Sequence, residues 1–259
     1  MNDNNKKVPY DPNEGTLETI KARPVTIKKD YPFFNRNIFF RMASFIIIWF
    51  FKFFVEILYA RIFMGFRVKN KKYYKSVKKE NFMAISNHIH PLDAFLIGTT
   101  FLPKKLYVLM RESNLGVPVF GKIMRLAGGV PIPTKKDAFV QLLRQIPETA
   151  KRKEAILMMP ETALRMYYVG IRPFSNGAFK IALSNTDIIL PSVYIYKKPR
   201  GLMKYLKRKP YLQLHFLEPI KIVSQGKNHE TISYYNEFTN QLMTDYFNQH
   251  SDLQPEEKK

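Results

Sequence analysis

Short apolar runs alternate with stretches of helical spacing along most of the chain. The runs are rich in β-branched, aliphatic and aromatic residues, which is typical of buried strands. Between them, apolar residues recur every three to four positions, as they do on one face of a helix. The predicted strands are 82–85, 106–110, 155–159, 188–195 and 211–216, and the predicted helices are 91–101, 115–126, 136–146, 176–184 and 230–247. This alternation predicts an α/β fold with a mainly parallel central sheet flanked by helices.

An apolar segment at residues 38–60 precedes these elements. Its uncharged centre, 42–51, is shorter than the roughly 20 apolar residues that a simple membrane span needs. At about 100° per residue, its polar side chains fall within one stripe of about 120°. The stripe contains Arg41, Ser44, Lys52, Glu56 and Tyr59. The pattern therefore predicts a helix with one narrow polar stripe and a wide apolar face.

The chain is strongly basic, because 42 lysines and arginines stand against 21 aspartates and glutamates, for a formal net charge of +21. Such a charge implies an anionic partner: nucleic acid, anionic lipid or a phosphorylated substrate. Basic residues cluster at 69–79, with two tyrosines among them, and at 197–209, where apolar residues alternate with them. Each cation near an anionic bilayer contributes about 1 kcal/mol, and the apolar interleaving of the second cluster favours an anionic membrane surface.

The chain has no cysteine, which excludes disulfides, thiolate metal sites and a cysteine nucleophile. Candidate chemistry stands instead at 87–93, which reads Asn-His-Ile-His-Pro-Leu-Asp after the predicted strand 82–85. Pro91 suits the first turn of a helix, so His88 would end the strand and Asp93 would lie one turn into the helix. In a continuous helix the two would be about 140° apart, so only a bend at Pro91 brings the carboxylate to the imidazole.

A neutral imidazole oriented by a carboxylate is a general base that can deprotonate a hydroxyl. Asp93 would hold the tautomer of His88 and stabilise the imidazolium. A second interpretation is a metal site, because His88, His90 and Asp93 alternate in a way that suits metal ligands. No further histidine or carboxylate stands at recognisable ligand spacing. We therefore predict no metal and no cofactor.

The 87–93 motif resembles the signature of the glycerolipid acyltransferases, which include the lysophosphatidic acid and glycerol-3-phosphate acyltransferases. Three later segments resemble the remaining blocks of that family, in the family's order. They are 119–130, a glycine-rich segment before an acceptor-binding strand; 159–162, Met-Pro-Glu-Thr; and 174–180 with 190–193, a glycine–alanine helix and a proline-bearing strand. The resemblance covers about residues 65 to 196, roughly half of the chain, and implies a glycerol-3-phosphate acyltransferase-like domain.

The resemblance also implies an acceptor site. Glu161 corresponds to the family's acceptor-site glutamate, and Thr162 stands where the family has glycine. The family's phosphate-binding arginine position falls on Leu164, so the residue in that role is either Arg165 or Arg172. A guanidinium suits the role because its fork binds two phosphate oxygens at once.

The second block departs from the family as well. Residues 131–134 stand where an arginine is usual, and Lys135 or Lys136 would replace its charge. The expected substrate-binding residues are therefore Glu161, Thr162, Arg165, Arg172, Lys135 and Lys136.

Three interpretations compete for the apolar segment. It is a core helix of a soluble domain, a transmembrane span in which Lys52 and Glu56 pair four residues apart, or a membrane-dipping helix pair of the kind that the family often carries. Basic residues flank both ends, which favours both ends on the cytoplasmic side. We expect monotopic or peripheral attachment to the cytoplasmic face of a membrane.

The expected organisation has four parts: a flexible polar tail at 1–32, a membrane-attaching helical segment at 33–66, the catalytic domain at 67–250 and a polar tail at 251–259. The expected function is O-acyl transfer from acyl-CoA or an acyl-carrier protein to a lysophospholipid, first of all lysophosphatidic acid to phosphatidic acid. One alternative is an acyltransferase for another lysophospholipid or a glycolipid. An alternative from another class is a basic, non-enzymatic nucleic-acid-binding protein, although no nucleic acid is expected as a partner, because that alternative explains neither the histidine–aspartate motif nor the apolar segment.

Overall fold

The computed structural model of the protein describes residues 22–199, 201, 205 and 210–253. An eight-stranded sheet forms its centre, with the strand order β1-β7-β6-β2-β5-β3-β4 and β8 paired with β6. Strands β6, β2, β5, β3 and β4 run parallel, whereas β7 and β8 are antiparallel to β6. The strands are β1 (Arg67–Lys69), β2 (Phe82–Ser86), β3 (Leu106–Arg111), β4 (Gly129–Ile132), β5 (Ala155–Met158), β6 (Ile188–Lys197), β7 (Tyr211–Phe216) and β8 (Ile220–Lys221). The predicted α/β fold with a mainly parallel central sheet is confirmed.

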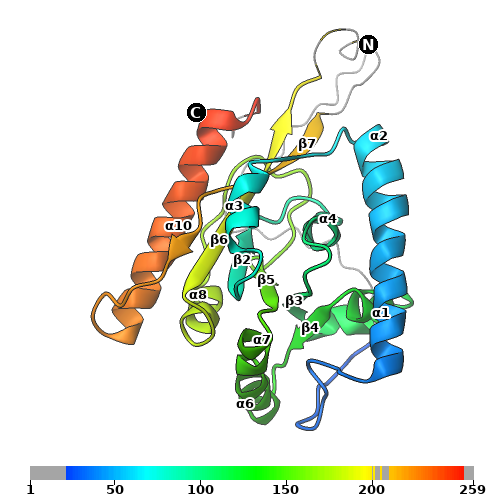
Figure 1. Ribbon diagram of the computed structural model, residues 1–259, viewed down its shortest axis with the longest axis vertical. Helices are drawn as coiled ribbons and strands as arrows, with labels where there is room; N and C mark the ends of the chain where they lie inside the picture. Colours follow the sequence, from blue (N-terminus) through cyan, green and yellow to red (C-terminus); the bar gives the residue numbers. More distant parts are fainter. Residues whose placement is uncertain (1–21, 200, 202–204, 206–209, 254–259) are drawn as a thin grey trace, which may run out of the picture.

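Helices cover both faces of the sheet (Figure 1). They are α1 (Ile38–Phe50), η1 (Phe51–Ala60), α2 (Arg61–Phe63), α3 (Lys71–Val77), α4 (Asp93–Thr100), η2 (Glu112–Gly116), α5 (Phe120–Leu126), α6 (Lys136–Gln145), α7 (Pro147–Lys151), α8 (Asn176–Leu183) and α10 (Asn228–His250). The predicted helix at 115–126 is shorter than expected and begins at Phe120. Pro118 explains the difference, because the residue before a proline is held in extended backbone, and Val117 has that conformation.

Alternate side chains of each central strand enter two separate cores. Met83 and Ile85 of β2 pack on the face that is covered by α6, α8 and α10. Phe82 and Ala84 of the same strand pack on the opposite face, against α3 and α4. Burial on both faces is typical of a parallel sheet and explains why these strands are continuous apolar runs. The carboxyl ends of the parallel strands remain available for a site.

Part of the expected tail at 1–32 is packed against the domain, which corrects the prediction for residues 22–32. Ile27 is buried in the core beside Phe33 and Phe34, and the Arg23 N–H donates to the Gly116 carbonyl at 2.9 Å. Residues 22–32 are held by isolated apolar side chains such as Ile27. Isolated apolar residues in a polar stretch produce no periodic pattern, so the sequence did not predict this packing. Residues 1–21 and 254–259 of the expected tails lie outside the described residues, as does most of the basic cluster at 197–209.

The apolar segment is one continuous helix, from α1 through η1 to α2, and not the expected helix pair. Ile38–Phe63 contains no glycine or proline to break it, and its 26 residues are long and apolar enough to cross a membrane. Gly65, with φ +61°, follows its end. Only 6% of its most apolar window is buried, which excludes the core-helix interpretation.

Three members of the polar stripe, Ser44, Lys52 and Glu56, face the domain, whereas Arg41 and Tyr59 are exposed. Ser44 and Glu56 are buried, and the Lys52 ammonium binds both Glu56 (2.7 Å) and the Thr99 carbonyl at the end of α4 (3.2 Å). Phe51 stacks on Phe95 of α4 with ring centroids 4.4 Å apart. The helix is therefore fastened along one side, and its wide apolar face is left exposed.

Candidate active site

Asn87 ends the pairing of β2 with β6. Its side-chain amide donates to the Tyr194 carbonyl (3.1 Å) and its oxygen accepts from the Tyr194 N–H (2.7 Å). The side chain thus takes the two hydrogen bonds that a backbone partner would otherwise make, and the main chain is free to leave the sheet. His88 consequently lies two residues beyond the carboxyl end of β2.

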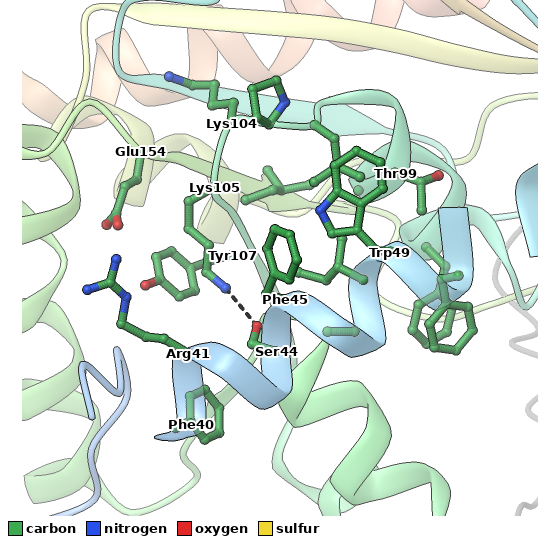
Figure 2. Close-up of a pocket in the computed structure, with 18 of the residues that line it drawn as sticks. Phe40, Arg41, Ser44, Phe45, Trp49, Thr99, Lys104, Lys105, Tyr107 and Glu154 are labelled. Carbon is green, nitrogen blue, oxygen red and sulfur yellow. Dashed lines mark hydrogen bonds between the residues drawn. The ribbon is translucent and has the colours of Figure 1, made fainter. Parts of the chain in front are cut away.

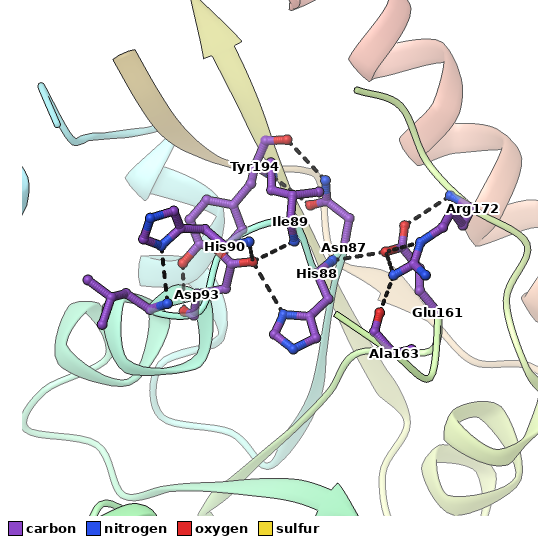
Figure 3. A network of polar contacts seen from close by, with 10 residues as sticks. Asn87, His88, Ile89, His90, Asp93, Glu161, Ala163, Arg172 and Tyr194 are labelled. Carbon is purple, nitrogen blue, oxygen red and sulfur yellow. Dashed lines mark hydrogen bonds and ion pairs between the residues drawn. The ribbon is translucent and has the colours of Figure 1, made fainter. Parts of the chain in front are cut away.

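Asp93 is the centre of the turn that follows (Figure 3). One carboxylate oxygen accepts from the N–H groups of Ile89 and His90, both at 2.7 Å, and lies 3.4 Å from His88 Nδ1. The Asp93 side chain is fully buried, and the Tyr194 hydroxyl donates to its backbone carbonyl at 2.7 Å. Helix α4 begins at Asp93 itself, so the turn around Pro91 brings the carboxylate to the imidazole.

This geometry leaves Nε2 of His88 as the nitrogen that faces away from Asp93. The imidazole is 23% exposed, whereas Asp93 is closed to solvent. When Nδ1 donates to the carboxylate, Nε2 is unprotonated and can accept a proton. The 3.4 Å separation is long for a hydrogen bond.

Glu161 ties a second loop to the same turn. Its Oε2 accepts from the His88 N–H at 3.0 Å, and its Oε1 accepts from the Arg172 N–H at 2.9 Å. The Arg172 guanidinium donates to Oε2 through Nε (3.2 Å) and Nη2 (2.9 Å) and also to the Ala163 carbonyl. Burial raises the pKa of the Glu161 carboxyl, and the Arg172 charge and the two backbone donors oppose that rise.

The Glu161–Arg172 pair is thus inside the protein, with side chains 0% and 5% exposed. Such a pair holds a loop in place and offers no open guanidinium face for a phosphate. The structure places Arg172 in a supporting position, although the sequence made it one of two candidates for binding phosphate.

The remaining expected substrate residues are placed differently. The Arg165 N–H donates to the His88 carbonyl at 3.3 Å, and its guanidinium lies 5.1 Å from the Tyr168 ring. Thr162 is exposed and has a φ of +64°. Lys135 and Lys136 are exposed at the start of α6, beyond β4, which is three strand spacings or about 14 Å from β2. The structure therefore gathers Arg165, and not these lysines, at His88.

His90 has a structural partner in the same turn, because its Nδ1 accepts from the Leu92 N–H at 3.1 Å. Among the described residues, no three histidine, aspartate or glutamate side chains lie close enough together to hold a metal ion.

Tyr194 and Tyr168 contribute to the site and were not singled out from the sequence. Tyr194 supports both Asn87 and Asp93, and Tyr168 lies beneath the guanidinium of Arg172, 5.7 Å from its centre. A tyrosine inside an apolar strand is one available signal, because a buried hydroxyl requires a partner.

A histidine–aspartate pair at the carboxyl edge of a parallel α/β sheet has the chemical groups that can take a proton from a hydroxyl. The profile of the Acyltransferase family matches residues 65–195, just over half of the chain. The chain belongs to the Acyltransferase family.

Two relatives extend the comparison. The chain is 30% identical over 123 residues to the 1-acyl-sn-glycerol-3-phosphate acyltransferase of Saccharomyces cerevisiae, and this match covers 46% of the chain and 40% of the yeast protein. The crystal structure of the 1-acyl-sn-glycerophosphate (LPA) acyltransferase PlsC from Thermotoga maritima has a similar fold, with a TM-score of 0.50 at 16% identity. That match covers 84% of this chain and 98% of the PlsC chain.

Proposed function

We propose that the protein is a membrane-attached O-acyltransferase that moves a fatty acyl group from a thioester to a hydroxyl of a lysoglycerolipid. Lysophosphatidic acid is the proposed acceptor and phosphatidic acid the product. The observation that carries the proposal is the His88–Asp93 pair, whose imidazole is partly exposed at the edge of the sheet while its carboxylate is buried. Family membership and the activity named for the yeast relative support it. They leave the nucleic-acid-binding alternative without support.

The proposed reaction needs one base and no covalent acyl-enzyme. Nε2 of His88 takes the proton of the acceptor hydroxyl while the oxygen attacks the thioester carbonyl. The tetrahedral intermediate collapses, the carbon–sulfur bond breaks, and the thiolate takes the proton from the imidazolium. Asp93 stabilises the imidazolium and fixes the ring, as a buried carboxylate does for other catalytic histidines.

Arg165 is the residue that we propose for the acceptor's phosphate. Its backbone is hydrogen-bonded to His88, so its side chain starts beside the base, and it is only partly buried. Glu161, held by Arg172, would act by fixing the backbone of His88. These two residues are then positioning residues.

The exposed apolar face of Ile38–Phe63 supports membrane attachment of the whole chain. We propose the boundaries 33–66 for the attaching segment and 67–250 for the catalytic domain, with the site at the cytoplasmic face. Acyl-CoA or an acyl-carrier protein is the proposed donor.

The test is an assay of the purified full chain in neutral lipid vesicles, with labelled acyl-CoA or acyl-carrier protein and a panel of lysolipids. Transfer to lysophosphatidic acid, identified by product mass, is the expected result. Transfer only to lysolipids without a terminal phosphate would replace the acceptor assignment, and no transfer to any hydroxyl would refute the reaction.

A further inference from the structure

A cleft of about 530 Å³ lies between α1 and the region from α4 to the start of β3 (Figure 2). Its polar end is remote from the candidate active site, whereas its wall also includes Ala94 and Phe95, which directly follow Asp93 in α4. Lys105 lines its polar end and immediately precedes Leu106, which is level with Phe82 across β5. His88 lies six residues beyond Phe82, so about 20 Å of extended chain separates Lys105 from His88 along the sheet. A glycerol phosphate is too short to reach from one to the other.

The polar end of the cleft is rich in cations. Among the described residues that line it are Arg36, Arg41, Lys104, Lys105 and Arg152, against the single carboxylate of Glu154. That carboxylate is already taken, because both of its oxygens accept from the Arg36 guanidinium, at 2.6 and 2.7 Å. Lys104 is also occupied, by three backbone carbonyls. Arg41, Lys105 and Arg152 remain to meet a ligand, and Figure 2 shows Arg41 and Lys105 on the side of Glu154 and Tyr107.

Lys105 is a buried cation whose charge is not balanced by an ion-paired carboxylate in the part of the chain that the structure describes. Its ammonium donates to the Ser44 hydroxyl at 3.0 Å and lies 5.2 Å from the Tyr107 ring, and no described carboxylate forms an ion pair with it. Burial lowers its pKa to about 8; Glu154 opposes this, and three nearby arginines add to it. An ammonium in this position is short of an anion, since buried charges are normally paired.

The other end of the cleft is apolar and opens toward the exposed face of α1. Phe45 and Trp49 line it from α1 and are 63% and 45% exposed, and Phe95 and Leu102 line it from the domain. A cavity with cations at one end and aromatic walls at the other fits an amphiphilic anion. The ligand that matches both ends, and that a helix in a bilayer would meet, is a phospholipid.

We propose that this cleft binds one anionic phospholipid of the surrounding leaflet, with its phosphate at Lys105 and Arg41 and its acyl chains along Phe45 and Trp49. The bound lipid fastens α1 to the domain from the side that faces the bilayer. This role is structural, and its test measures lipid binding without requiring turnover.

The test uses Trp49, the sole tryptophan of the chain, as the reporter. The full chain in neutral detergent micelles is titrated with dioctanoyl phosphatidic acid or with dioctanoyl phosphatidylcholine, and the tryptophan fluorescence is followed. Phosphatidic acid should bind at least tenfold more tightly. Lys105→Met and Arg41→Met should each weaken it about tenfold or more, the loss typical of one charge-assisted contact. Lys122→Met, an exposed lysine of α5 outside the cleft, is the matched control and should bind normally.

Three outcomes would overturn the proposal. One is an equal response to the two lipids, and another is normal binding of phosphatidic acid by both variants. The third is that inorganic phosphate or free coenzyme A produces the same response at the same concentration, which would assign the cleft to a soluble phosphate. Because Arg41 is exposed, its variant tests the site even where the change at Lys105 disturbs folding.

Discussion

The imidazole of His88 is the group to which the proposed reaction assigns the proton. His88→Ala should lower kcat by roughly 10²–10⁴-fold, the range for a positioned general base. His90→Ala is the matched control, because His90 lies in the same turn, where its ring accepts from the Leu92 N–H and lies edge-on to the Tyr167 ring. Turnover by both variants, with circular dichroism to check the fold, decides the matter. Equal losses in the two, or near-normal turnover of folded His88→Ala, would contradict the assignment.

Substitutions of Arg165 and Arg172, which lie in the same loop, should affect different properties: acceptor binding and stability. Arg165→Ala is expected to raise KM about tenfold or more for a phosphorylated acceptor and to leave kcat nearly unchanged, because a phosphate contact is equal in ground and transition states.

Arg172→Ala removes one partner of a buried ion pair and should destabilise the fold by about 3–5 kcal/mol, measured by denaturant unfolding. The reverse pattern, a stable Arg172→Ala enzyme with a raised KM, would return the phosphate role to Arg172.

Thr162 holds a conformation that suits glycine, the residue that the family has there. A β-branched side chain at φ +64° is strained, so Thr162→Gly should stabilise the protein by about 1 kcal/mol. Thr162→Ala keeps a Cβ at the same backbone angle and serves as the control, with no comparable gain expected. Thermal melting of the two variants gives the answer, and an equal gain in both would show that the hydroxyl, and not the backbone, matters.

At the scale of elements, the sequence predicted contacts between residues close along the chain and did not predict contacts between distant segments. The pairing of His88 with Asp93 is local and follows from one proline-containing turn. The Glu161–Arg172 pair joins the ends of a loop without periodicity, and its attachment to His88 crosses between strands. Such contacts leave no pattern, so the sequence identified both residues but did not predict that Arg172 is buried against Glu161.

The absence of a clear apolar pattern also explains why the sequence did not predict α3, β1 and β8. The central strands are buried on both faces and appear as apolar runs, whereas α3 is mostly exposed and lysine-rich, and β1 and β8 have only three and two residues. Residues 22–32 are held by isolated contacts such as that of Ile27. The division of the apolar segment into two helices came from the family resemblance, and the absence of glycine and proline within Ile38–Phe63 already argued for one.

The exposed face of this helix should be the anchor. Replacing Phe45, Ile46, Trp49, Phe50 and Phe53 with serine should release the protein from vesicles at high salt, because each large apolar side chain buried in lipid contributes about 1.5–3 kcal/mol. Tyr234→Ser with Phe238→Ser on α10 changes exposed aromatics elsewhere and is the control. Sedimentation with vesicles measures the effect. If the variant with all five serine substitutions is folded and still sediments with the vesicles, this helix is not the anchor.

At the scale of the whole molecule, the apolar helix and the long C-terminal helix α10 lie on opposite sides of the sheet (Figure 1). The apolar contact is therefore confined to one side, while a net charge of +21 attracts the entire chain to an anionic surface. We expect the charge to speed arrival at the membrane, an effect that salt weakens, since screening at about 1 M reduces the Debye length to about 3 Å. We expect the apolar helix to account for retention. The two contributions can be separated by varying salt and lipid charge independently.

The helix Ile38–Phe63 is unbroken and packs along α4, which begins at Asp93. A membrane that binds this helix would therefore lie at a constant distance from the His88–Asp93 pair. A protein held in this way searches for its acceptor in two dimensions. The quantity that controls its rate is then the mole fraction of acceptor in the leaflet, and not the amount per volume of solution. With the protein fully bound and total acceptor constant, added inert neutral lipid should slow turnover in proportion to the dilution, while acceptor and vesicles increased together should not change it. A rate that follows bulk acceptor concentration would show that the acceptor arrives from solution.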